Sequence, residues 1–196
     1  SVVLLHSLCL KSFALPRRLT MKNEQDKTLR ALQIAIQMEI DGKEYYQKVG
    51  RSSEDQLCRE LFRSLAAAED LHWQKFKEIY DAIRNREGWP VTNFQPEGGK
   101  GLRTIFARAT EAIGSNAKAP ASELDAIQTG INMEIKSYDF CKSHVKDTTC
   151  DVERDFYDMV AVEEREHHLV LLDCYEFLKD PAGWFVTKEH PSLDGG

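Results

Sequence analysis

Apolar residues recur at helical spacing along four long stretches of the chain. Within each stretch they return after three or four residues, which gathers them on one face of an α-helix. The first predicted helix starts between Asp26 and Thr28 and ends before a turn at Ser52 and Ser53. The other three cover about residues 54–86, 121–145 and 151–178. The pattern therefore predicts an all-α protein.

The segment between the second and third of these helices interrupts the helical pattern. Its sequence, "REGWPVTNFQPEGGKG", contains two prolines and four glycines. A short amphipathic helix over about residues 101–114 follows, and the whole linker is long enough to cross a helix bundle from end to end. The third long helix then begins after Pro120, with Ser122 as its predicted N-cap.

The two ends of the chain differ in composition from the part between them. Residues 1–20 contain three basic residues and no acidic one, and their apolar run is too short and interrupted to span a bilayer. They are either a cleaved targeting leader or sequence ahead of a start at Met21. We expect this segment to be disordered, followed by one domain over residues 21–180. Residues 181–196 are expected to form an extended C-terminal tail that packs on its own bundle or on a neighbour.

Charged residues repeat along the chain at a fixed distance. Glu39, Glu69 and His72 recur 95 residues later. In both halves, 30 residues separate a single Glu from a Glu-x-x-His motif. The surrounding sequence repeats as well, since "ALQIAIQMEI" at residues 31–40 matches "AIQTGINMEI" at residues 126–135. The second set consists of Glu134, Glu164 and His167.

Helical geometry brings these residues together. The Glu and His of a Glu-x-x-His motif lie on one helix face and can reach the same ion. A turn near Ser52 places Glu39 and Glu69 at the same height in an antiparallel hairpin, and a turn near Thr148 does the same for the second half. Two such hairpins packed together form a four-helix bundle. Four glutamates and two histidines then converge at its centre.

A glutamate within an apolar helical stripe needs a partner, because burying an unpaired charge costs several kcal/mol. A solvated helix face is the simpler alternative, but six matches at one register argue against coincidence. Ligands rich in carboxylate with two imidazoles favour iron or manganese over zinc. We therefore predict a dinuclear metal site. Its predicted ligands are Glu39, Glu69, His72, Glu134, Glu164 and His167.

Other ionisable residues flank the last motif. An alternative choice of ligands on this helix, Glu163 with Glu166, would keep a pair of glutamates but lose the histidine. The repeat selects Glu164 and His167 instead. We expect Glu163, Glu166 and His168 to lie around the ligands or on the surface.

The segments "MEIDGKEYY", "AAAEDLH", "MEIKSY" and "VEEREH" resemble the di-iron domain of rubrerythrins, over roughly residues 27–180. The resemblance implies a ferritin-like bundle of two helical hairpins joined by the long crossover, holding two iron ions or manganese in their place. It also places Tyr46 beside the ligands, as a candidate catalytic residue. Two departures stand out. Ser137 occupies the position of an additional glutamate of the family, and no Cys-x-x-Cys motif of a rubredoxin domain is present.

The resemblance implies a non-haem di-iron oxidoreductase that reduces hydrogen peroxide, or less readily dioxygen. Its electrons would come from an external donor such as a rubredoxin-like protein. One alternative is an iron-binding protein of the storage type with ferroxidase activity, which requires a large hollow assembly. Another is a metal-stabilised interaction module without turnover. We expect a homo-oligomer, with a dimer as the simplest form.

Composition narrows the possible partners and compartment. The formal net charge of the 196 residues is -6, and no block of like charge resembles a nucleic-acid-binding arm. We therefore expect neither nucleic acid nor a membrane as a partner. The five cysteines are odd in number and lack paired spacing, which favours a reducing cytoplasm over a disulfide framework.

Overall fold

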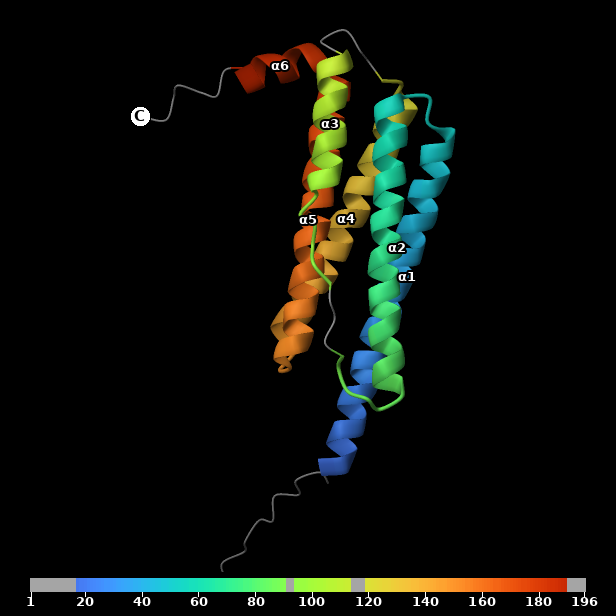
Figure 1. Cartoon of the computed structure of the whole chain (residues 1–196), viewed down its shortest axis with the longest axis vertical. Helices are drawn as coiled ribbons and strands as arrows, with labels where there is room; N and C mark the ends of the chain where they lie inside the picture. The colour runs from blue at the N-terminus through green and yellow to red at the C-terminus, as the bar shows by residue number, and fades with distance from the viewer. Residues whose placement is uncertain (1–16, 91–93, 114–118, 190–196) are drawn as a thin grey trace, which may run out of the picture.

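The computed structural model describes residues 17–90, 94–113 and 119–189. Within these ranges the chain forms six helices and no strand, so the predicted all-α fold is confirmed (Figure 1). The described part contains no helix both long and apolar enough to cross a membrane. The helices are α1 (Arg17–Ser52), α2 (Gln56–Arg84), α3 (Lys100–Ile113), α4 (Ala121–Asp147), α5 (Asp151–Lys179) and α6 (Pro181–Glu189).

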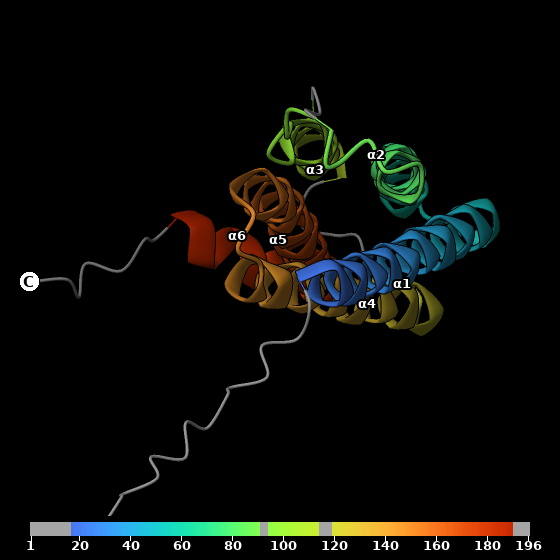
Figure 2. The ribbon, with the colours of Figure 1, turned by 90° about the horizontal axis from the view of Figure 1, so that it is seen from below.

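Two antiparallel hairpins form the bundle. Helix α1 pairs with α2, and α4 pairs with α5 (Figure 1). The segment after α2 returns along the bundle, so that α4 starts at the end where α1 turns into α2. Helix α3 belongs to this crossover and packs on the outside of α2 and α5 (Figure 2). The arrangement is the ferritin-like topology that the sequence predicts.

Most helix boundaries follow the predicted ones within two residues, but α1 does not. It starts at Arg17, well before the predicted start at Asp26 to Thr28. The prediction relied on the apolar stripe, which begins at Leu29. No proline or glycine separates Arg17 from that stripe, so nothing in the backbone chemistry stops the helix from extending. Residues 1–16 of the expected leader lie outside the described residues.

Two other local predictions are wrong. The N-cap of α4 is Pro120 rather than Ser122, and it makes no side-chain capping bond. Residues 181–189 of the expected extended tail form the helix α6, and residues 190–196 lie outside the described residues. Proline is favoured in the first turn of a helix, so Pro181 ends one helix and begins the next. Within α6, Trp184 packs against Phe106 and Phe177, which fixes the start of the tail to its own bundle.

The apolar core is divided into two clusters along the bundle axis. One surrounds Phe62 and Phe177, and the other surrounds Phe76 and Phe156. On α2, α4 and α5 the predicted ligands fall in sequence between the residues of the first cluster and those of the second. The core therefore encloses a layer of charged side chains between two apolar layers.

A buried carboxylate ties the two hairpins together at one end. Glu123, in the first turn of α4, accepts a hydrogen bond from the Ser53 hydroxyl at 2.9 Å. It also accepts one from the backbone N–H of Glu54 at 2.9 Å. These donors belong to the turn between α1 and α2. Glu123 thus fixes where the second hairpin starts relative to the first.

Replacing Glu123 by alanine should destabilise the protein by about 1–3 kcal/mol, because it leaves buried donors of the α1–α2 turn without an acceptor. The free energy of unfolding can be measured by urea denaturation followed by circular dichroism. Asp125→Ala is the matched control, since Asp125 is an exposed acid near the start of the same helix. Equal losses in both variants would show that helix-terminal charge, rather than the tether, accounts for the effect.

Candidate metal centre

The six predicted ligands meet in the centre of the bundle. Glu39 comes from α1, Glu134 from α4, and each of α2 and α5 supplies one Glu-x-x-His pair. All six side chains are buried, with at most 4% of any residue exposed. Their positions follow from the hairpins, which set residues 30 apart in sequence at the same height.

The cluster contains two overlapping sets of possible ligands. Glu69 and Glu164 belong to both sets. The first set adds Glu39 and His72, and the second adds Glu134 and His167. In each set, the ligand atoms lie within 4.8 Å of one another. This is the arrangement expected for two neighbouring cations that share two carboxylates.

Nδ1 of His72 has more carboxylate neighbours than one N–H donor can bind well. The Nδ1 atom of His72 lies 3.0 Å from Glu164, 3.4 Å from Glu39 and 3.8 Å from Glu69. A single N–H can donate to only one of these carboxylates. Atoms that bind one ion at about 2.0–2.2 Å stand about 3–4 Å apart, which fits these distances.

Several polar atoms of the cluster lack hydrogen-bond partners among the described residues. Buried polar atoms without partners are rare because each costs free energy. Bound cations would satisfy all of them at once, so the residues present fit a metal centre. The atoms are Oε2 of Glu39 and Glu134, both carboxylate oxygens of Glu164, and Nδ1 of His72 and His167.

The pKa shifts within the cluster also indicate that its carboxylates need positive charge to balance them. Burial raises the pKa of Glu69 and of Glu164 well above the usual value, and the neighbouring carboxylates raise both further. Burial alone would lower the pKa of His72, but the surrounding carboxylates raise it well above its usual value. Without metal, the cluster would therefore hold protons in place of cations.

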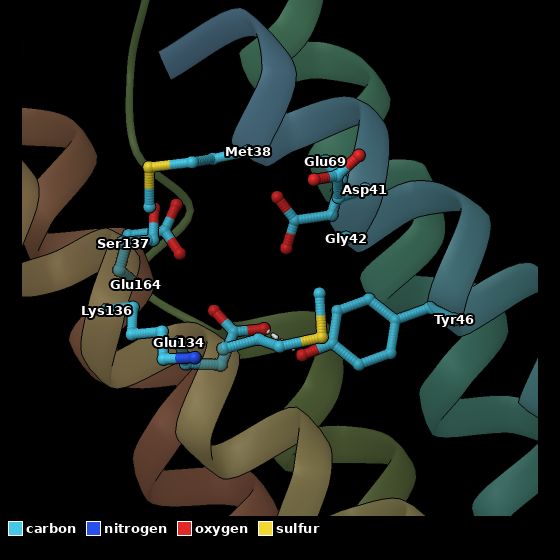
Figure 3. Close-up of a pocket in the computed structure, with 10 residues that line it drawn as sticks. Met38, Asp41, Gly42, Tyr46, Glu69, Glu134, Lys136, Ser137 and Glu164 are labelled. Atoms are coloured by element: carbon cyan, nitrogen blue, oxygen red, sulfur yellow. Dashed lines mark hydrogen bonds between the residues drawn. The ribbon is translucent and has the colours of Figure 1, made fainter. Parts of the chain in front are cut away.

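Tyr46 contacts the cluster as expected from its position. Its hydroxyl donates a hydrogen bond to Glu134 (Figure 3). Burial, together with the charge of Glu134, raises the pKa of Tyr46 well above its usual value, so the hydroxyl keeps its proton. Gly130 leaves room for the ring, since a Cβ atom there would lie 3.1 Å from it. A catalytic role for Tyr46 remains a prediction.

The flanking acids bind the crossover rather than joining the ligand sets. Glu163 is buried and accepts the backbone N–H of Gly98 at 2.5 Å, and its other oxygen lies 3.8 Å from Nε2 of His167. Glu166 forms an ion pair with Arg103 of α3. Neither acid belongs to either set within the described chain. Sequence reasoning missed these contacts, for which the glycine pair at residues 98 and 99 was the available signal.

Two cavities approach the cluster from different sides. One, of about 190 Å³, lies between α1 and α4 and reaches Glu69, Glu134 and Glu164 (Figure 3). The other, of about 260 Å³, lies between α2 and the crossover and reaches His72 and His167. The carboxylate side and the imidazole side of the cluster are thus approached separately.

Comparison with known proteins gives one match. The family model described as Rubrerythrin matches residues 30–175, a span that contains Tyr46 and all six clustered residues. Neither the curated proteins nor the solved structures give a significant match. The matched span covers most of the chain and has the bundle and buried cluster described above. The chain therefore belongs to the rubrerythrin family.

Proposed function

We propose that the protein is a non-haem di-iron oxidoreductase that reduces hydrogen peroxide with electrons from an external donor. One observation carries the proposal: two sets of buried ligands share Glu69 and Glu164. A pair of cations bridged in this way can act as a unit in a two-electron step. Membership of the rubrerythrin family supports iron as the metal, and manganese is the alternative for the same ligands.

Each half of the cluster would hold one ion. Glu39 and His72 would bind the first, Glu134 and His167 the second, and the two shared carboxylates would lie between them. When bound, an iron pair would supply the two electrons needed to cleave the O–O bond of peroxide. Two protons are taken up at the same time, and two water molecules result.

The residues around the ligands hold the centre in place and limit its contact with water. Tyr46 fixes the orientation of Glu134 through its hydrogen bond. The two apolar clusters enclose the charged layer from both ends of the bundle. In such surroundings the electrostatic interactions of the ligands are stronger than they would be in water. As the electron donor we propose a rubredoxin-like protein.

Two iron ions should bind per chain when the protein is reconstituted with ferrous iron in the absence of oxygen. Glu164→Ala should abolish binding of the pair, because Glu164 belongs to both ligand sets. Glu163→Ala is the matched control and should leave the stoichiometry at two, since Glu163 contacts Gly98 instead. Elemental analysis measures both. The reverse pattern would mean that the adjacent residue is the ligand.

Hydrogen peroxide should oxidise the ferrous protein much faster than air does, because peroxide accepts both electrons in one encounter. Stopped-flow absorbance with equimolar oxidants measures the two rates. Similar rates, together with iron accumulating beyond two ions per chain, would favour the ferroxidase alternative. Bound iron with no reaction towards either oxidant would favour the interaction module without turnover.

Tyr46→Phe should slow the reaction with peroxide by about 10–100-fold while two iron ions still bind, because the change removes only the hydroxyl that orients Glu134. Tyr45→Phe is the matched control. The hydroxyl of Tyr45 donates to the backbone carbonyl of Ala126, away from the ligands. If both variants react at the rate of the unmodified protein, Tyr46 has a structural role only.

A further inference from the structure

The 95-residue repeat places equivalent residues around the cavity between α1 and α4. The lining residues of α1 and those of α4 occupy equivalent positions in the repeat. The cavity therefore lies between equivalent faces of the two halves of the chain. Figure 3 shows Met38 and Asp41 of α1, and Lys136 and Ser137 of α4, around the carboxylates. The equivalent pairs are Met38 with Met133, Asp41 with Lys136, and Gly42 with Ser137.

Small side chains leave space beside the carboxylates. A Cβ atom at Gly42 would lie 3.4 Å from the side chain of Glu69, so the absence of a side chain keeps this side of Glu69 open. Ser137 lines the same cavity, at the position where the sequence departs from the additional glutamate of the family. The cavity therefore reaches the shared carboxylates Glu69 and Glu164 without a further ligand in the way.

The second cavity does not offer an equivalent approach. It meets His72 and His167, but the Nδ1 atoms of these rings face the carboxylates. A molecule in that cavity would meet the other edges of the rings. The crossover is also held against α5 by the bond from Gly98 to Glu163. The cavity between α1 and α4 is thus the more direct path to the shared carboxylates.

Two methionines line that path from equivalent positions of the repeat. Met38 and Met133 line the cavity, are half-buried, and each directly precedes a clustered glutamate. A methionine side chain is long, unbranched and flexible, so two of them can fill much of a small opening and still move for a small molecule. Their positions in the lining of the cavity, rather than any polar contact, would let them select entering molecules by size.

We propose that Met38 and Met133 form a gate that admits hydrogen peroxide and excludes bulky organic hydroperoxides. The substrate class rests on the function proposed above, whereas the size limit concerns the cavity alone. Either oxidant would take up two electrons and two protons as its O–O bond breaks. Hydrogen peroxide gives two water molecules, and cumene hydroperoxide gives cumyl alcohol and water. Because the chemistry is the same, the difference between them is size.

The size limit can be tested on metal-free protein through a thiol introduced by Ser137→Cys. Methyl methanethiosulfonate is the small reagent and N-(1-pyrenyl)maleimide the bulky one, with peptide mapping to separate the new site from the exposed Cys150. Only the small reagent should label position 137. Adding Met38→Ala and Met133→Ala should raise labelling by the bulky reagent about tenfold or more, as expected when a pocket loses a steric restriction.

Controls separate size from folding. Met38→Leu with Met133→Leu retains bulk and should retain the exclusion of the maleimide. Met159→Ala changes a half-buried methionine of α5 outside the cavity and should have no effect. The proposal is overturned if the maleimide labels the introduced thiol as fast as Cys150, if neither reagent labels it, or if the alanine pair changes nothing.

A second measurement on iron-loaded protein links the gate to the oxidant. Hydrogen peroxide should oxidise the unmodified protein faster than cumene hydroperoxide, and the alanine pair should reduce this preference about tenfold. If neither peroxide reacts, the proposed function fails, while the labelling still decides whether the gate exists. Equal rates with both peroxides in the unmodified protein would overturn the gate.

Discussion

The structure depends on the burial of four carboxylates in the middle of an apolar bundle. Removing such charges from water costs several kcal/mol per group unless cations or hydrogen bonds compensate. Here the apolar core is interrupted to accommodate them, and it forms one cluster on each side of the charged layer. If the cluster bound only protons, Nδ1 of His72 would still face three carboxylates. Two divalent cations would balance the charge of the layer and would thereby stabilise the fold.

The rest of the chain keeps this layer in register. The connection within each hairpin brings residues that are 30 apart in sequence to the same height along the bundle. This holds for α1 with α2 and for α4 with α5. Glu123 then fixes the hairpins relative to each other at one end through Ser53. Glu163 anchors the crossover beside His167. Glu123 and Glu163 are both buried carboxylates that belong to neither ligand set.

The fold and the convergence of six residues could be predicted because both depend on periodicity. Helical spacing defines the faces, and the 95-residue repeat distinguishes Glu164 from its neighbour Glu163. The start of α1 was missed because its first turns carry no apolar stripe. The helix after α5 was missed because Pro181 interrupts the helical pattern there, although proline also suits the first turn of a helix such as α6. The partners of Glu123 and Glu163 lie far away in sequence. The glycine pair at residues 98 and 99 indicates a close approach there, but no local pattern identifies the residue that it meets.

The hydrogen bond from Tyr46 makes the two halves of the centre chemically different. The residue equivalent to Tyr46 in the second half is Cys141, whose buried thiol lies near Glu164 and Glu39. A thiol is a much weaker donor than a phenol. Glu134 thus shares its negative charge with a proton donor, whereas Glu39 has no such donor at the matching position. The two ligand sets are therefore chemically inequivalent, and two cations bound there would form a polarised pair instead of a symmetric one.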